Sequence, residues 1–176
     1  MNSEVVPIYG LGLFFVRESG LVEQVVIFDY YDPLEEYKAI MLERRRLKEE
    51  KARLAQNMQY FLDLEEVKIN DKRTYPRVRD VEIGFRGDYN HPYITFFITF
   101  TGELRAGLNI YEDSYEPEIA EYDYKVYWVL PTKARIVRAD LGVLYEVREN
   151  GRILEFSVEK GMEIRGYERI EFELSP

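Results

Sequence analysis

The second half of the sequence alternates apolar and polar side chains in short runs, and this pattern limits the possible folds more than any other feature. In the run 93–100, the residues Ile94, Phe96, Ile98 and Phe100 fall on one face of a strand. The connections between the runs are too short for helical crossovers, so most neighbouring strands must be antiparallel. The sequence therefore predicts an α+β fold that is mostly antiparallel β, arranged as a sandwich or an open barrel.

Two turn signals set the expected strand pairing. After the turn at 101–103, Leu108 and Ile110 alternate with Asn109, which predicts a hairpin with the preceding strand and the two aliphatic side chains inward. The Asn-Gly pair at 150–151 is the strongest signal for a tight hairpin turn. The strands expected in this half cover 81–85, 93–100, 104–110, 124–130, 135–139, 143–148, 153–158 and 167–174.

The N-terminal residues predict a β-hairpin, because apolar runs lie on both sides of turn residues at 18–20. The polar stretch at 71–78 is the best candidate for a boundary. It would separate a unit made of the hairpin and a helix, 1–70, from an antiparallel β unit, 79–176. We expect one continuous core instead, and therefore a single domain over 1–176.

A long helix is expected after the hairpin. The carboxylate of Asp32 can accept hydrogen bonds from free backbone N–H groups, and Glu35 completes the spacing of a capping box. No Gly or Pro interrupts the following stretch. The sequence therefore predicts one helix that ends near Leu62, or two helices broken near Asn57.

Along this helix, an apolar residue recurs at every seventh position. The set consists of Ile40, Leu47, Leu54 and Phe61. The intervening seam positions Arg44 and Lys51 are charged, which leaves only a narrow apolar stripe there. One interpretation is an amphipathic helix that lies across the sheet, where the aliphatic parts of its long basic side chains cover the edges of the sheet. In the other, the segment from Met41 to Arg53 projects and pairs with a protein partner or with a second copy, which would make the protein a homodimer.

Charge and residue usage exclude several classes of protein. Lys and Arg total 24 against 33 Asp and Glu, and the net charge of −9 disfavours general binding to nucleic acid or to a membrane surface. The absence of Cys removes disulfides, thiolate nucleophiles and cysteine-bound metals. The apolar run near the N-terminus is too short to span a bilayer and follows no basic residue. We expect a cytoplasmic protein, and the Glu-rich composition favours a thermophile as its source.

The most distinctive segment is 111–124, called the acidic tyrosine segment below, which contains six acids, four tyrosines and no basic residue. It fits a solvated loop, a recognition surface for a basic partner, or a Mg²⁺ or Ca²⁺ site, although its spacing is not that of a calcium loop. In the second interpretation, tyrosines provide contact area while carboxylates steer the partner. The binding residues would be Tyr111, Tyr115, Glu121, Tyr122, Tyr124 and Trp128.

Two other functions use neighbouring residues. Asp123 and Lys125, together with Asp113, have the spacing of a divalent-metal-dependent phosphodiesterase or nuclease, although such triplets are common in a chain that is 32% charged. The second alternative is a β module that binds a small, sugar-like ligand. The stacking faces would come from Tyr122, Tyr124, Tyr127 and Trp128. The single histidine, His91, follows Asp88 in a segment whose composition is typical of a turn.

No constellation of reactive residues in the sequence rises above chance. We therefore expect a non-enzymatic recognition protein that requires no cofactor and no metal. It would recognise its partner through the acidic tyrosine segment, the long charged helix, or both.

Overall fold

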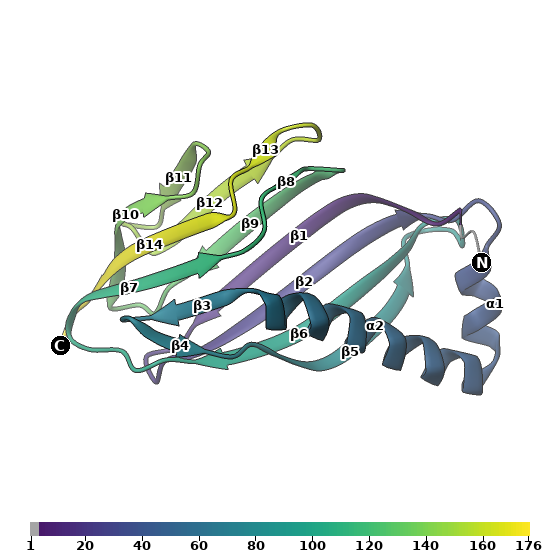
Figure 1. Cartoon of the computed structure of the whole chain (residues 1–176), viewed down its shortest axis with the longest axis horizontal. Helices are drawn as coiled ribbons and strands as arrows, with labels where there is room; N and C mark the ends of the chain where they lie inside the picture. Colours follow the sequence, from purple (N-terminus) through teal and green to yellow (C-terminus); the bar gives the residue numbers. More distant parts are fainter. Residues whose placement is uncertain (1–3) are drawn as a thin grey trace.

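The structure is a computed structural model that describes residues 4–176 (Figure 1). Within these residues, fourteen strands and two helices follow one another along the chain. In chain order they are β1 (Val6–Val16), β2 (Leu21–Tyr31), α1 (Glu36–Leu42), α2 (Arg44–Leu64), β3 (Glu66–Ile69), β4 (Lys72–Thr74), β5 (Arg77–Phe85), β6 (Pro92–Thr101), β7 (Gly107–Ser114), β8 (Glu118–Ile119), β9 (Asp123–Val129), β10 (Ala134–Asp140), β11 (Tyr145–Arg148), β12 (Ile153–Val158), β13 (Glu163–Ile164) and β14 (Tyr167–Leu174).

The strands form two main sheets and a short two-stranded one. The large sheet has the order β11-β12-β9-β1-β2-β6-β5, and the small sheet has the order β10-β14-β7-β3-β4. The strands β8 and β13 pair separately. Neighbours are antiparallel except β1 and β9, which run parallel. The expected α+β fold, mostly antiparallel with an N-terminal hairpin and a helix packed on the sheet, is confirmed, and the strands of residues 4–176 do not close into a barrel.

The N-terminal hairpin lies in the middle of the large sheet. The strand β1 pairs with β2 on one side and with β9 on the other, where Tyr9 lies opposite Asp123. The strand β2 pairs with β6 along nearly its whole length. The hairpin therefore contributes the two central strands to which the later strands are added.

Asp32 caps the first helix as expected, but the helix begins later than the capping-box spacing predicts. The buried carboxylate of Asp32 accepts hydrogen bonds from the backbone N–H groups of Glu36 and Tyr37, at 3.0 and 2.9 Å. Glu35 adopts a left-handed conformation with a φ of 52°. It therefore lies outside α1, and the expected capping box does not form.

The prediction of one long helix, or of a break near Asn57, is wrong, because the break lies at Glu43. Glu43 has extended backbone angles and separates α1 from α2. Its bend allows Tyr37 of α1 and Leu54 of α2 to enter the same buried cluster with β5 and β6. A single straight helix leaving Asp32 would not follow this path.

The predicted hairpin between β6 and β7 does not form either. The two strands belong to different sheets, because the chain after Thr101 crosses from the large sheet to the small one. The inward face of β7 is also opposite to the expected one, since Asn109 is fully buried while Leu108 is 40% exposed. The side chain of Asn109 explains this choice, because it exchanges hydrogen bonds with the backbone of Arg105 at 2.9 and 2.8 Å and so fixes the crossing segment.

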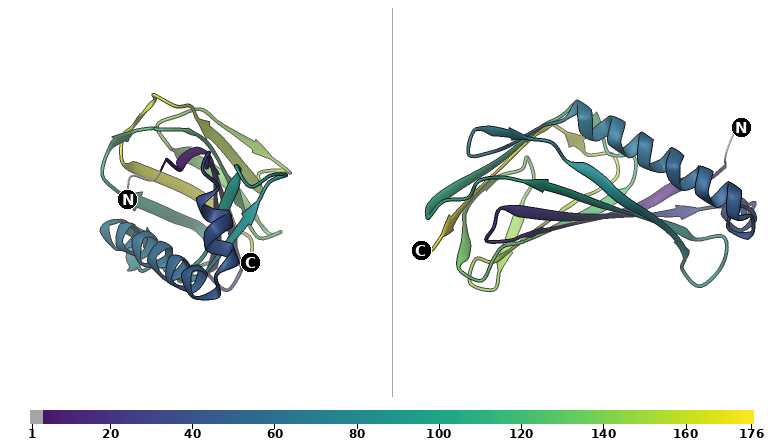
Figure 2. Two further views of the ribbon diagram at one scale, coloured as in Figure 1. Left: turned by 90° about the vertical axis from the view of Figure 1, so that its right-hand side faces the viewer. Right: turned by 90° about the horizontal axis from the view of Figure 1, so that it is seen from below.

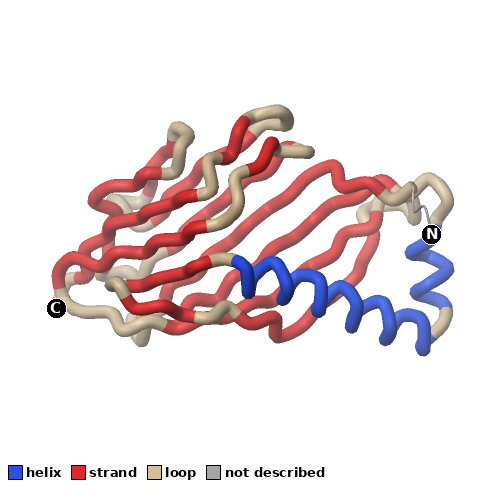
Figure 3. The backbone as a smooth tube through the Cα atoms, in the orientation of Figure 1, coloured by secondary structure: helices blue, strands red, loops and turns tan. Residues whose placement is uncertain are grey.

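The small sheet and α2 cover adjacent parts of one face of the large sheet (Figure 2). One buried cluster lies between the two sheets and includes Val22, Trp128 and Ile170. The other lies under α2 and includes Leu54 and Ile94. The helix α1 lies at the end of the molecule opposite to β10 and β11, and α2 runs from that end toward the middle, where it meets β3 (Figure 3). Neither helix within residues 4–176 combines the length and hydrophobicity that crossing a lipid bilayer requires.

Candidate functional site

A pocket opens between the two sheets, close to the junction of the small sheet with α2. It has a volume of about 270 Å³ and is partly open to solvent. This size is near the lower end of the range for small-molecule sites. Its floor belongs to β1, β2 and β9 of the large sheet, its opposite wall to β7 and β14 of the small sheet, and one side to the residue that ends α2. We call this space the inter-sheet pocket.

Two glycines lie on the inner face of β1, and one of them, Gly12, leaves part of this space open. Gly10 and Gly12 lie opposite Phe28 and Val26 of β2, in a sheet whose inner face otherwise carries large side chains. A Cβ atom at Gly10 would lie 3.1 Å from the Cβ of Tyr124, which is tighter than an ordinary contact. At Gly12, the nearest atom would be 3.6 Å away, on Val126, so a side chain there would fit into the space.

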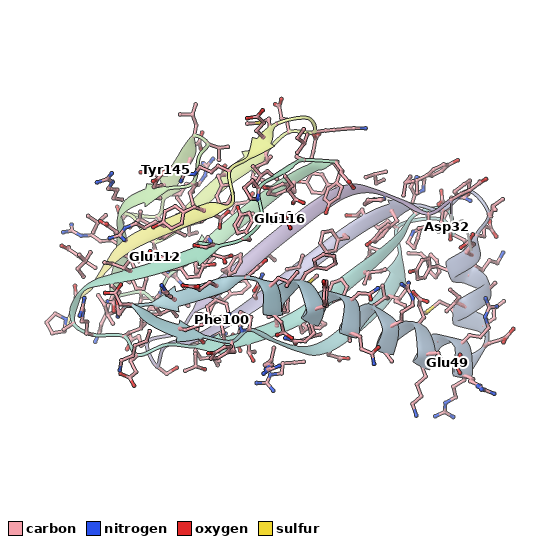
Figure 4. The ribbon with its side chains drawn as sticks, viewed as in Figure 1. Asp32, Glu49, Phe100, Glu112, Glu116 and Tyr145 are labelled. Atoms are coloured by element: carbon pink, nitrogen blue, oxygen red, sulfur yellow. The ribbon has the colours of Figure 1, made fainter. Side chains whose placement is uncertain are left out.

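The small sheet contributes an acidic and aromatic wall. Because successive side chains of a strand point to opposite faces, β7 and the residue after it turn Tyr111, Asp113 and Tyr115 toward the pocket. The side chains between them face outward, and Glu112 pairs there with Arg169 at 3.2 Å. Figure 4 labels the outward-facing Glu112 on the small sheet, and Phe100, which lines the pocket, on the large sheet.

Asp113 and Glu65 meet in this wall. Asp113 is 7% exposed, and Glu65 follows the last turn of α2. Burial, the charge of Glu65 and a hydrogen bond to it raise the pKa of Asp113 to about 8. Burial raises the pKa of Glu65 to about 7. Two carboxyls can share a hydrogen bond only when one is protonated, so burial makes this pair hold a proton near neutral pH.

The Asp113 carboxyl also has an oxygen that no N–H or hydroxyl group of residues 4–176 reaches. Its Oδ1 atom is buried and has no hydrogen-bond partner among residues 4–176. Buried polar atoms of this kind are rare, because a lost hydrogen bond to water is costly to leave unreplaced. A side chain that lines a pocket and keeps a buried acceptor free is therefore suited to meet a donor from a bound molecule.

Glu168 of β14 is the third carboxyl of the wall. Its Oε1 accepts a hydrogen bond from the hydroxyl of Tyr115 at 3.2 Å. Burial, followed by the nearby charge of Asp113, raises the pKa of Glu168 to about 7. Burial likewise raises the pKa of Tyr111, Tyr115 and Tyr124, so these phenols stay neutral and can act as donors.

The pocket lining is acidic without a compensating base. Within residues 4–176, four lining residues are acids and none is Lys, Arg or His. The acids are Glu65, Asp113, Glu118 and Glu168. The remainder is largely apolar or aromatic, with Phe14, Val126 and Phe156 among the contributors. Such a lining repels anions and offers hydrogen-bond acceptors beside an apolar surface.

The structure brings together four of the six binding residues that the sequence indicates. These four are Tyr111, Tyr115, Tyr122 and Tyr124, all lining the inter-sheet pocket. Glu121 is exposed and lies outside it. Trp128 is only 2% exposed and forms part of the core, where its ring stacks on Phe14 with centroids 4.1 Å apart.

The three residues of the nuclease alternative do not meet. Asp113 faces the pocket, whereas Asp123 accepts a hydrogen bond from the backbone N–H of Lys160 at 2.8 Å. Lys125 lies on the outer face of β9, 3.6 Å from Glu155 and above the ring of Tyr127. Within residues 4–176, no group of three or more Asp, Glu or His side chains has positions that could hold a metal ion.

Two acids of the pocket, Glu168 and Glu65, are not among the candidate residues that the sequence indicates. Glu168 could have been found, because the alternation that turns Ile170 and Phe172 inward in β14 also turns Glu168 inward. Glu65 offers no such signal, since it follows a helix and its position depends on where α2 ends against β3. The large separation of both residues from Asp113 in the sequence hides their proximity.

Comparisons with known proteins give only distant similarities. No family model matches the sequence, and no curated protein matches it. The folded domain of LppM from Mycobacterium tuberculosis is similar with a TM-score of 0.44 and 8% identity, over 96% of this chain and 91% of that one. An M1 zinc metallopeptidase from Deinococcus radiodurans has a TM-score of 0.42 and 10% identity, over 96% of this chain but only 42% of the peptidase. No statement about binding follows from either similarity.

Proposed function

We propose that this protein is a non-enzymatic recognition module that binds a small organic molecule in the inter-sheet pocket. The observation that carries the proposal is the buried, unpartnered Oδ1 of Asp113 in the wall of a pocket of about 270 Å³. The acidic tyrosine segment takes part, because its residues Tyr111, Asp113, Tyr115, Tyr122 and Tyr124 line this pocket. Recognition is thus directed inward, toward a small ligand.

The pocket supports binding for three physical reasons. Its apolar floor removes the nonpolar surface of a ligand from water, which is the main favourable term. Its tyrosines supply rigid contact area and hydroxyl groups. Its walls come from elements that are held by the cores of the protein, so little order has to be gained on binding.

Titration with indole, a flat neutral molecule, tests the proposal, and glucose serves as the sugar-like probe. We expect indole or glucose to shift the backbone NMR signals of β1, β7 and β9. In the variant Gly12→Val the added methyl groups occupy the pocket, and these shifts should disappear. The control Ser157→Val adds the same groups to the exposed Ser157, outside the inter-sheet pocket, and should bind like the wild type. Shifts that persist in Gly12→Val, or no shifts with either probe, would contradict the proposal.

A second route of recognition uses the helix. Near the end of α2, Tyr60, Phe61 and Leu64 are each more than 60% exposed. Large exposed apolar side chains of this kind are typical of contacts with another protein. We propose this surface as the site for a protein partner or a second copy, and light scattering over a concentration series is the test. A mass that rises in the wild type but not in Phe61→Glu supports it, and a constant monomer mass removes the self-association form.

A further inference from the structure

We propose that the ligand of the inter-sheet pocket is a small organic amine, whose ammonium group binds at Asp113 and whose apolar body lies beside Gly12. This inference rests on the proposed binding function and specifies the class of molecule. It goes beyond a generic ligand because the lining combines acids with apolar and aromatic side chains.

The ammonium group of the ligand would bind at the Oδ1 atom of Asp113. Oδ1 is buried and lacks a partner among residues 4–176, so a donor from the ligand would satisfy it. An ammonium group carries up to three N–H donors, and hydrogen bonds between charged groups are stronger than neutral ones. Glu65 lies near enough to raise the pKa of Asp113, and Glu168 lies near enough for Asp113 to raise its pKa, so both carboxyls could receive the remaining donors.

The charge of the pocket lining also favours an amine as the ligand. The wall holds three carboxyls with no cationic side chain among the described lining residues. In the free protein, burial penalises the charge of these carboxyls and raises their pKa values, so the wall retains protons near neutral pH. An ammonium group would replace a proton as the compensating charge, whereas a carboxylate or phosphate would add to the repulsion.

The floor of the pocket offers space and apolar contacts for the apolar part of the amine. Gly12 leaves space beside Phe14 and Val126, whereas the ring of Tyr122 and the Cβ of Tyr124 pack against Gly10. Aromatic faces also attract a nearby cation. A volume of about 270 Å³ accommodates a single ring with a short chain.

Binding should release protons, since an ammonium group displaces the proton shared by the acids. The groups that face Asp113 are Glu65 from the end of α2, Glu168 from β14 and the phenols Tyr111 and Tyr115. Farther along the pocket are Glu118, Tyr122 and Tyr124. The cation Arg165 acts on Glu168 from outside the lining, where it forms an ion pair with Asp140 at 2.6 Å.

Calorimetric titration at pH 7.5 with three probes of one shape tests the inference. The probes are phenethylamine, 2-phenylethanol and phenylacetate, which differ in the charge of one end. We expect the amine to bind roughly tenfold or more tightly than the alcohol, as for one charge-assisted hydrogen bond, and phenylacetate not to bind. Repeating the amine titration in two buffers with different ionisation enthalpies should show proton release.

The isosteric variant Asp113→Asn should bind phenethylamine and 2-phenylethanol with similar affinity. The variant Glu168→Gln serves as a second test at the same wall and should lower the preference for the amine. The matched control Glu112→Gln removes a carboxylate from the outer face of the same strand, and should keep the wild-type preference. Each variant is compared by its NMR spectrum, so that loss of fold is recognised directly.

Several outcomes would overturn the inference while leaving the binding function intact. The first is equal affinity for the alcohol and the amine, together with indole binding that is lost in Gly12→Val. The second is an amine preference that survives in both Asp113→Asn and Glu168→Gln. The third is binding of Mg²⁺, Mn²⁺ or Ca²⁺ that displaces phenethylamine and depends on Asp113, which would replace the amine by a metal. If neither indole, glucose nor any of the three probes binds, the proposed function itself fails.

Discussion

Asp113 is a carboxylic acid held in the protein interior beside two other acids. In the folded protein its pKa is about 8, compared with an ordinary value of 3.8, and burial is the main cause. Between these two pH values the folded state binds a proton that the unfolded state has lost. The free energy of unfolding therefore falls as the pH rises through this window, and Glu65 and Glu168 act in the same direction.

The variant Asp113→Asn should remove part of this pH dependence. Asparagine carries no ionisable proton and can donate a hydrogen bond to Glu65. We expect the decrease in unfolding free energy between about pH 5 and pH 8 to be smaller than in the wild type by about 1–2 kcal/mol. Urea denaturation at several pH values measures it. Glu112→Gln is the control, and equal slopes for wild type and Asp113→Asn would contradict the assignment.

Asn109 shows how a single buried amide can fix a chain crossing. Its side chain is fully buried and also accepts a hydrogen bond from the side chain of Asn70 at 2.9 Å. The variant Asn109→Leu has a similar size but leaves the backbone of Arg105 and the amide of Asn70 without their partner. We expect a loss of about 2–4 kcal/mol in unfolding free energy by chemical denaturation. The exposed helical control Asn57→Ala should change it by less than about 0.5 kcal/mol, and an equally small effect of Asn109→Leu would refute this role.

At the scale of elements, α1 depends on a cap that precedes it. Asp32→Ala removes the carboxylate that accepts from Glu36 and Tyr37, and we expect a loss of about 1–2 kcal/mol. Faster amide exchange should be confined to α1. Glu49→Ala on the outer side of α2 removes a carboxylate from an exposed ion pair, and should have little effect (Figure 4). Equal effects of the two substitutions would show that the cap does not stabilise α1.

The elements also show where sequence patterns succeed. The predicted hairpin between β11 and β12 forms around Asn150 and Gly151, although its loop covers residues 149–152 and Glu149 adopts a positive φ angle together with these two residues. The core face of β6 also follows the expected alternation, since Ile94 and Ile98 are each 1% exposed. In both cases the local residues alone determine the outcome.

Sequence patterns fail where contacts between residues far apart in the chain determine which way a side chain points. For β7, apolar alternation favours Leu108 as an inward residue, but the hydrogen bonds of Asn109 and the pocket select the other face. The tyrosines of the site could be predicted because they cluster in sequence. Their joint orientation toward Glu65 and Glu168 could not, because it requires three separate elements to be placed first.

For the whole molecule, Gly102 is the residue at which the chain crosses between the sheets. A Cβ atom there would lie 2.5 Å from the side chain of Ile69 on β3, so the two sheets would have to shift apart. We expect Gly102→Ala to lower the unfolding free energy by about 1–3 kcal/mol. Gly12→Ala is the matched control, because its new methyl group would meet Val126 at 3.6 Å. Thermal denaturation compares them, and a Gly102→Ala loss no larger than that of Gly12→Ala would contradict this account.

The position of β1 has a consequence for how the chain reaches its native state. During synthesis, the first strand leaves the ribosome long before β9, although the two are hydrogen-bonded neighbours from Tyr9↔Asp123 to Phe15↔Val129. One edge of the nascent hairpin therefore stays open until most of the chain has been made. Pairing between such remote segments is slow, and an open edge during that delay attracts other strands. The emerging polypeptide is thus most vulnerable to aggregation before β9 arrives, and it is at this stage that it would benefit from a chaperone.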